Sequence, residues 1–241
     1  MLKKFAMAVT AASTMGMSAF AVSETVPSPI GDFDVSMSAT LATDYIWRGQ
    51  SQTQGKAAVQ ASLDVGHESG VYTGIWASNV DGDVFDGASI EVDYYIGYGN
   101  DINDVLSYDL SWNVYTYPGG VGNVEEWIGS LSAYGLTGGV KYAYHPGSSL
   151  YKFVSYSHEL PYDTGVILAL GHTDTKDYLL ERRHGETYTD WSLTLAKTFA
   201  TVDFALMYSD TNLSNSVCRD WYLDRTSSCG SNWTFSASKA F

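Results

Sequence analysis

The chain has 241 residues, a formal net charge of −14 and 14% aromatic side chains. The acidic excess argues against a nucleic-acid partner, because nucleic-acid phosphates would be repelled. After the N-terminal segment there is no run of about 18 apolar residues, which argues against a transmembrane helix. The composition, with 17% charged residues, 23 Gly and 18 Tyr, is typical of a β protein rich in interfacial aromatics.

The first 21 residues have the pattern of a secretory signal peptide. Lys3 and Lys4 precede a run of apolar and small residues, and Ala19-Phe20-Ala21 matches an A-x-A cleavage site. A short membrane anchor is the alternative, but the apolar run is too short to span a bilayer comfortably. We therefore predict a signal peptide over 1–21, a polar periplasmic leader over 22–33 and a β-barrel over 34–241.

Alternation of apolar and polar residues with a period of two runs through most of 34–241, whereas helical periodicity is hard to find. In one segment Leu110, Trp112 and Val114 share a face, and Ser111 and Asn113 share the other. The pattern predicts about twelve strands, with boundaries uncertain by about 2–4 residues. They are 34–48, 55–67, 70–80, 88–99, 105–117, 123–134, 136–145, 149–159, 163–173, 188–199, 201–211 and 231–241.

The connections between these strands alternate in length. The two longest, 174–187 and 211–230, are both odd-numbered when counted from the first strand. The even-numbered connections are short and contain Gly, Pro or Asn, which supply the backbone angles of turns. This alternation predicts an all-β, antiparallel, up-and-down transmembrane barrel in the bacterial outer membrane, with long extracellular loops and both termini periplasmic.

The last strand, 231–241, has a largely aromatic face and a face of small, mostly polar residues. The aromatic face ends on Phe241, the final residue, which resembles the C-terminal signal read by the barrel assembly machinery. Lys239 departs from this pattern, and we expect it near the membrane boundary, where its stem can snorkel. We expect the strand to pair with 34–48 and close the barrel, in contact with outer-membrane lipid and lipopolysaccharide.

Four tryptophans, Trp47, Trp112, Trp191 and Trp233, fall on the apolar face of the predicted strands. Outer-membrane barrels carry girdles of aromatic residues at both membrane interfaces. We therefore predict that these four form an interfacial girdle rather than a sugar-binding track.

The polar faces of the strands should line the barrel lumen, where charged side chains bias the selectivity of a pore. Acidic residues outnumber basic ones on these faces, which favours cations or zwitterions. The alternative is a plugged barrel in which Arg48 and Lys141 only neutralise carboxylates. The predicted pore-lining residues are Asp44, Arg48, Gln60, Asp64, Glu91, Asp93, Asp109, Asn113, Glu126, Lys141 and Asp203.

The two cysteines, Cys218 and Cys229, lie in the last long connection. In an exported protein such a close pair predicts a disulfide, with two free thiols as the alternative. The C-x10-C spacing is not that of a metal site. The five His residues match no metal or nucleophile motif, so we predict no catalytic residue, metal or cofactor.

Four stretches of the predicted strands and turns stand out together. They are DYIWRGQSQT (44–53), GVYTGIWASNV (70–80), EVDYYIGY (91–98) and YTYPG (115–119). Taken jointly, they resemble the TorF-like porin family of proteobacteria. The resemblance covers the front half of the mature chain. It implies an outer-membrane location and the passage of solutes, and it carries no catalytic residues. The pair Cys218 and Cys229 is not part of it.

These features together predict an outer-membrane channel for passive diffusion of small hydrophilic solutes, which is not an enzyme. One alternative is a closed structural or surface-interaction barrel that uses its long loops. Another is an outer-membrane hydrolase, because such enzymes assemble their catalytic groups across strands, where sequence spacing does not reveal them. A soluble secreted sandwich is a further alternative.

Overall fold

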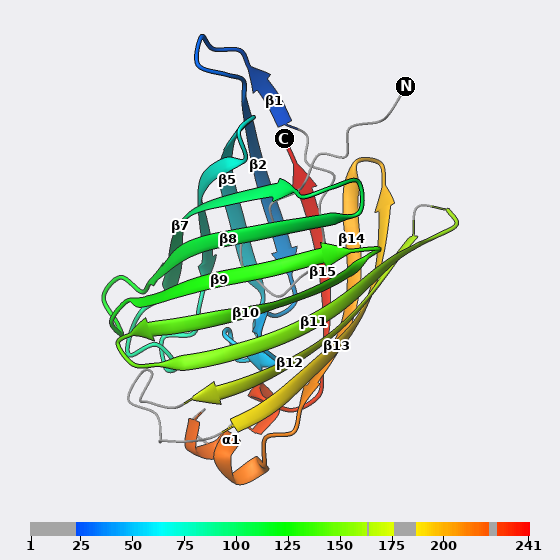
Figure 1. Cartoon of the computed structure of the whole chain (residues 1–241). Coiled ribbons are helices and arrows are strands. Elements are labelled where there is room, and N and C mark those ends of the chain that lie inside the picture. The colour runs from blue at the N-terminus through cyan, green and yellow to red at the C-terminus, as the bar shows by residue number, and fades with distance from the viewer. Residues whose placement is uncertain (1–22, 163, 176–186, 222–225) are drawn as a thin grey trace.

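The computed structural model describes residues 23–162, 164–175, 187–221 and 226–241, which form a tilted β-barrel (Figure 1). The predicted signal peptide, 1–21, lies outside these residues. Twelve strands make the wall of the barrel. They are β2 (Phe33–Ala42), β5 (Ala58–His67), β6 (Val71–Asn79), β7 (Ile90–Asp101), β8 (Leu106–Thr116), β9 (Val124–Ala133), β10 (Leu136–His145), β11 (Ser149–Leu160), β12 (Thr164–Thr175), β13 (Thr187–Phe199), β14 (Val202–Thr211) and β15 (Asn232–Ala240).

The sheet closes on itself because β2 pairs with both β5 and β15. All pairings are antiparallel and, apart from this closure, join wall strands that follow each other in the chain. Closure leaves no wall strand with an unpaired edge. The predicted all-β, antiparallel, up-and-down barrel is confirmed, and so is the pairing of the last strand with the first. Every strand boundary lies within three residues of its prediction except the end of the first strand.

The first strand of the wall ends at Ala42, so the prediction of a strand reaching residue 48 is wrong. Residues 43–57, here called the inner loop, leave the wall and fold into the barrel. Within this loop, β3 (Ile46–Trp47) and β4 (Gln50–Ser51) form a small hairpin. Arg48 and Gly49 turn the chain between them with φ angles of 49° and 74°, in the left-handed region that a continuous strand does not contain.

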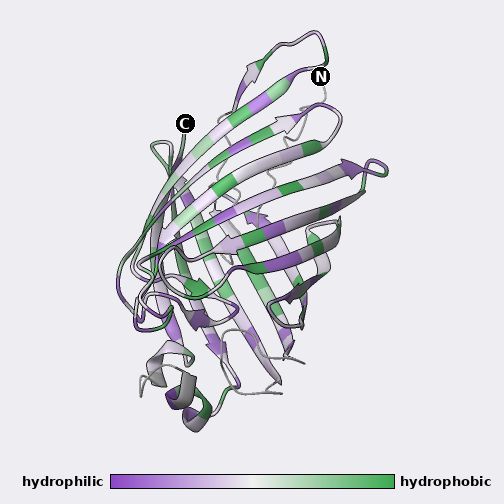
Figure 2. Ribbon diagram, turned by 90° about the vertical axis from the view of Figure 1, so that its left-hand side faces the viewer, coloured by the Kyte–Doolittle hydropathy of each residue, from purple (hydrophilic) through white to green (hydrophobic). Residues whose placement is uncertain are grey.

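The outer face of the barrel is apolar, whereas the inner face is polar. Figure 2 shows hydrophobic and hydrophilic segments alternating along the strands. In β15, Trp233 and Phe235 are exposed, while the intervening Thr234 and the following Ser236 are buried. Large side chains such as Leu168, on β12, are likewise exposed on the outside. In water this much apolar surface would be unfavourable, whereas a bilayer stabilises it, as in outer-membrane barrels.

The two ends of the barrel differ. Short turns follow β5, β7, β9, β11 and β13, and the C-terminus lies at the same end. The opposite end carries the longer connections, including α1 (Asn215–Trp221) and the 3-10 turn η1 (Thr226–Ser228). No helix in the described part of the chain is long and apolar enough to cross a membrane. That the short-turn end faces the periplasm remains a prediction.

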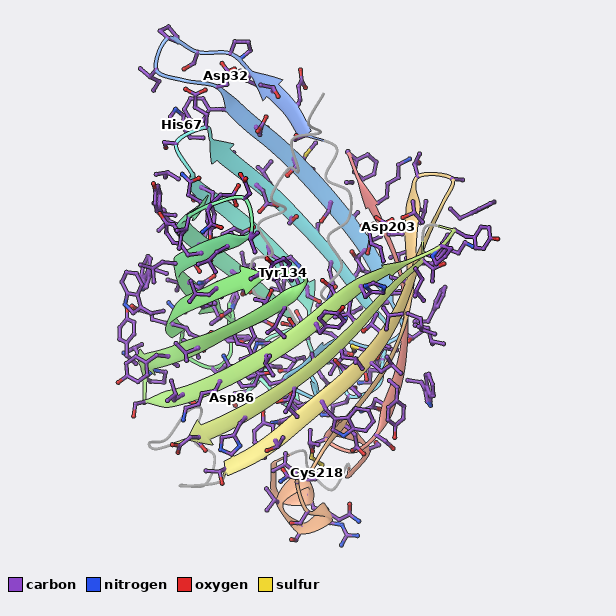
Figure 3. The ribbon with its side chains drawn as sticks, turned by 45° about the vertical axis from the view of Figure 1, so that its right-hand side comes forward. Asp32, His67, Asp86, Tyr134, Asp203 and Cys218 are labelled. Carbon is purple, nitrogen blue, oxygen red and sulfur yellow. A yellow bond between two sulfur atoms is a disulfide. The ribbon has the colours of Figure 1, made fainter. Side chains whose placement is uncertain are left out.

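The predicted leader forms a hairpin that projects beyond the short-turn end. β1 (Ser23–Val26) pairs with the first residues of β2, and all four of its side chains are exposed. The side chain of Thr25 donates a hydrogen bond to Asp34 across this pair, at 2.7 Å. Figure 3 shows Asp32 and His67 near this hairpin, and Asp86 and Cys218 toward the opposite end. β1 therefore covers the part of the β2 edge that lies beyond the pairing with β15.

Candidate functional site

The inner loop is a compact, buried structure inside the barrel. The carboxylate of Asp44 accepts hydrogen bonds from the hydroxyls of Ser51, at 2.6 Å, and Thr53, at 2.7 Å. The backbone N–H of Gln52 donates to the carbonyl of Tyr45, at 2.7 Å. All five of these side chains are buried. Because these polar groups satisfy one another, their burial in the lumen costs less than that of unpaired groups would.

Arg48, at the tip of the inner loop, attaches the loop to the barrel wall. Its guanidinium donates to Glu126 of β9, and both side chains are only 1% exposed. The same guanidinium lies 4.1 Å from the ring centre of Trp47 and 4.5 Å from that of Tyr151 on β11. The second oxygen of Glu126 accepts a hydrogen bond from Tyr115 at 2.7 Å. The charge on Arg48 is thus neutralised and its flat group is held by two aromatic rings.

The prediction that Trp47 belongs to a lipid-facing girdle is therefore wrong. Trp47 lies in the inner loop, where it packs against Arg48 and the apolar cluster at the mouth of the barrel. The apolar parity of the predicted first strand does not apply, because that strand has already ended at Ala42. Trp191 and Trp233 are exposed on the outside of the wall, as a girdle would require.

An acidic pair faces the inner loop from β7. Glu91 accepts a hydrogen bond from the hydroxyl of Tyr117 at 2.9 Å. Asp93 lies directly opposite Trp76 on β6 and Tyr115 on β8. One carboxylate oxygen of Glu91 and one of Asp93 are buried without a hydrogen-bond partner among the described residues. Such unpartnered acceptors are costly in a barrel interior.

A second charged group lies on the wall between β10 and β13. Tyr151 donates to Asp190 at 3.1 Å, and the ammonium of Lys141 lies 5.8 Å from the ring centre of Phe153. Lys141 is attracted electrostatically to Glu126, Asp190 and Asp93. Carboxylates nevertheless dominate the buried charges of the described residues. The buried acids are Asp44, Asp81, Glu91, Asp93, Glu126, Asp190 and Asp203, and the buried bases are Arg48 and Lys141.

Nearer the short-turn end, two tyrosines lie flat across glycines of the neighbouring strand. Tyr72 lies opposite Gly97, and Tyr95 lies opposite Gly74. A Cβ added to Gly97 would lie 2.3 Å from the Tyr72 ring, and one added to Gly74 would lie 2.4 Å from the Tyr95 hydroxyl. The tyrosine hydroxyls reach the carboxylates of Asp109 and Asp64, respectively. The glycines therefore make room for tyrosines that hold these two acids.

An apolar cluster surrounds the inner loop at the long-loop end. Tyr45, Val84 and Phe85 belong to it, together with the disulfide between Cys218 and Cys229, whose Cα atoms are 6.0 Å apart. The predicted disulfide is thus present. The ammonium of Lys56 in the inner loop lies 2.5 Å from the carboxylate of Asp81, in the connection between β6 and β7.

A further set of contacts links the disulfide to the tip of the inner loop. The hydroxyl of Thr211 donates to the carbonyl of Cys229 at 2.5 Å. A Cβ on Gly49 would lie 2.5 Å from Thr211, so the loop tip packs closely against β14. The inner loop, the β6–β7 connection and the β14–β15 connection therefore meet over this end of the lumen.

The predicted pore-lining residues are gathered in the interior. Nine of the eleven are buried, and Asp64 and Asp109 are half-buried. In a single-walled barrel with a lipid-facing exterior, a shielded polar side chain on the wall points to the lumen. Asp44 and Arg48 reach the interior from the inner loop and not from the wall, which corrects their predicted position.

Sequence reasoning missed several residues of this interior. Asp190 lies on the polar parity of its strand, so the alternation contained the signal for it. Tyr45, Trp76 and Tyr151 are aromatic, and a rule that places polar residues inside and aromatic ones outside does not select them, whereas Tyr115 lies on the polar parity of its strand. Their inward position follows from the register with Asp93 and from the contacts of Arg48.

A comparison of sequences decides the family. The model of a family described as "Bacterial protein of unknown function (Gcw_chp)" matches residues 27–241. The chain belongs to the Gcw_chp family. The matching description does not carry the TorF-like name, which stays a prediction from the four motifs. No curated protein sequence matches the chain.

Solved porin structures have the same fold as this Gcw_chp protein. The KdgM porin is 8% identical with a TM-score of 0.54, over 86% of this chain and 99% of that one. The NanC porin is 10% identical with a TM-score of 0.54, over 86% and 98%. The KdgM porin has also been solved "in complex with disordered oligogalacturonate", at 8% identity and a TM-score of 0.53. At these identities the likeness shows the fold alone, a closed antiparallel β-barrel.

Proposed function

We propose that this protein is an outer-membrane channel through which small hydrophilic solutes diffuse, and that the inner loop forms its constriction. The observation that carries the proposal is the charged interior inside an apolar outer wall. A barrel that served only to fill the membrane would gain nothing from burying seven carboxylates and two cationic side chains. The porin fold of the KdgM and NanC structures supports the same reading.

The excess of buried carboxylates favours passage of cations or zwitterions over anions. Arg48 is already matched by Glu126, so one of the two buried bases has its charge compensated within the protein. Oligogalacturonate, the ligand named for a KdgM structure, is a polyanion that this interior would repel. The fold is therefore shared with KdgM, while the preferred solute differs in charge.

A closed structural or surface-interaction barrel is the second candidate, and the burial of the inner loop favours it. Tyr45, Ile46 and Arg48 are each at most 2% exposed, and an apolar cluster covers them at the long-loop end. If this arrangement is permanent, the lumen is plugged. The channel reading requires that water and ions pass beside the loop or that the loop moves.

Conductance separates the two candidates. Purified protein, shown to be folded by a change of gel mobility on boiling in detergent, is inserted into planar bilayers in KCl. Discrete current steps with a reversal potential that favours K⁺ in a KCl gradient support the channel. Silence of folded, inserted protein refutes it and favours the closed barrel. A reversal potential that favours Cl⁻ refutes the cation preference and leaves the channel intact.

The proposal also includes partners and excludes catalysis. The exposed aromatic face of β15, ending at Phe241, is suited to recognition by the barrel assembly machinery, and the long-loop end would meet lipopolysaccharide. The barrel interior is proposed to act on no bond of the solute. A hydrolase would instead be revealed by turnover of phospholipid or peptide by the folded protein.

A further inference from the structure

Beyond a general preference for cations, the lumen holds a specific arrangement around Glu91 and Asp93. We propose that these two carboxylates, with the aromatic side chains of Tyr45, Trp76 and Tyr115, form a binding site for small organic cations that carry N–H donors, such as alkylammonium ions. The proposal names the solute class of the channel and in that respect rests on the proposed function.

The two carboxylates lie next to each other on the same face of β7, since residues two apart in a strand point the same way. Glu91 is 3% exposed and Asp93 is 4% exposed. Glu91 is opposite Ser78 on β6, its Oε1 accepts from Tyr117 at 2.9 Å, and the hydroxyl of Tyr45 also acts on this carboxylate. The remaining acceptor positions lack a donor: Oε2 of Glu91 and Oδ1 of Asp93 have no partner in the described structure.

Aromatic side chains surround these acceptors on three sides. Trp76 and Tyr115 are the direct cross-strand neighbours of Asp93 on β6 and β8, a spacing at which side chains touch. Tyr45 approaches from the inner loop and meets Trp76 edge to face, with ring centres 5.3 Å apart.

This combination selects a particular chemistry. Buried carboxylate oxygens without donors favour a ligand that brings both positive charge and N–H groups. Aromatic faces around them favour an organic cation, through cation–π contact, over a hydrated inorganic ion. No three His, Cys, Asp or Glu side chains in the described part of the chain are placed to hold a metal ion. An anion would meet two carboxylates and is excluded by repulsion.

The cations that the protein itself supplies do not fill this role. Arg48 pairs with Glu126 and packs against the rings of Trp47 and Tyr151. Lys141 attracts Asp93 electrostatically, but it also attracts Glu126 and Asp190. Neither cation donates a hydrogen bond to Glu91 or Asp93 in the described structure, so the unpartnered oxygens of the pair stay available to an entering cation.

The test uses putrescine as the probe and 1,4-butanediol as its uncharged counterpart. Folded wild-type protein in detergent is titrated by isothermal calorimetry, which needs no conduction. We expect saturable binding of putrescine and none of the diol. The variant Glu91→Gln/Asp93→Asn should bind putrescine at least tenfold more weakly. The control Asp64→Asn/Asp109→Asn removes the same number of charges from the lumen, at acids already held by Tyr95 and Tyr72, and should bind within about twofold of wild type.

Each outcome has a clear meaning. No binding of putrescine to folded wild-type protein overturns the site, and so does equal weakening in both double variants, which would indicate a diffuse charge effect. Binding of the diol with similar strength also overturns it. The channel proposal is judged separately from bilayer currents. Conduction without putrescine binding leaves the channel and removes the site, whereas binding without conduction leaves the site and removes the channel. Boiling-dependent gel mobility confirms that each variant is folded.

Discussion

Arg48→Ala is the substitution that most directly tests how the inner loop is held. The change removes the guanidinium that pairs with Glu126 and lies between Trp47 and Tyr151. Breaking a buried ion pair by removing one partner costs about 3–5 kcal/mol, because the other charge is left buried. Each lost contact with an aromatic ring adds about 0.5–2 kcal/mol. Most of this cost should fall on the docking of the inner loop, since Arg48 is its tip.

The expected result is a mobile loop in an intact barrel. A weakening of about 3 kcal/mol changes the ratio of docked to undocked loop by roughly two orders of magnitude, at about 1.4 kcal/mol per factor of ten. Single-channel recordings should therefore show larger conductance or frequent switching between levels. The midpoint of thermal unfolding should fall. Boiling-dependent gel mobility should be retained, because the pairings of the twelve wall strands do not involve Arg48.

A double variant separates loss of the ion pair from loss of packing. In Arg48→Ala, Glu126 remains buried and keeps the hydrogen bond from the Tyr115 hydroxyl. Adding Glu126→Gln removes that uncompensated charge, so the double variant should be more stable than Arg48→Ala alone. Conductance and unfolding midpoint of Arg48→Ala that match wild type would refute the view that this ion pair anchors the loop. So would a double variant less stable than the single one.

Three further perturbations test the wall, the mouth and the outer face. Gly97→Ala places a Cβ 2.3 Å from the Tyr72 ring and should lower the free energy of unfolding by about 1–3 kcal/mol. Gly66→Ala places a Cβ that meets nothing within 4 Å and should change this free energy little, so equal effects would contradict the packing argument. Cys218→Ala/Cys229→Ala removes a constraint of about 3 kcal/mol. Its unfolding midpoint should lie well below that of the oxidised wild-type protein, and the difference should be smaller when both proteins are measured under reducing conditions; an unchanged midpoint would show that the cluster holds without the disulfide. Leu168→Arg, on the outer face of β12, should destabilise the barrel in lipid by about 2–4 kcal/mol. Leu136→Arg, beside a short turn, should destabilise it by about 0–1 kcal/mol, and the opposite order would mean that Leu168 does not face the bilayer interior.

Strand positions and faces were largely predictable because side-chain alternation is a local property of an extended chain. In β8, Ser111, Asn113 and Tyr115 are buried, and the intervening Trp112 and Val114 are not, as their parity indicates. The same rule placed Glu91, Asp93, Glu126 and Lys141 inside. The disulfide followed from two nearby cysteines in an exported chain, and closure followed from alternating loop lengths.

The inner loop shows what the sequence alone does not contain. Residues 46–47 and 50–51 also form strands, as β3 and β4, so the local pattern gives no sign that the chain has left the wall. What turns the loop inward is contact with distant residues: Arg48 meets Glu126 and Tyr151, and Gly49 packs against Thr211. The sequence by itself determined the barrel and the polarity of its two faces, because both depend on neighbours within a strand. Only the tertiary structure decided what occupies the lumen, because that depends on which side chains the closed wall brings together.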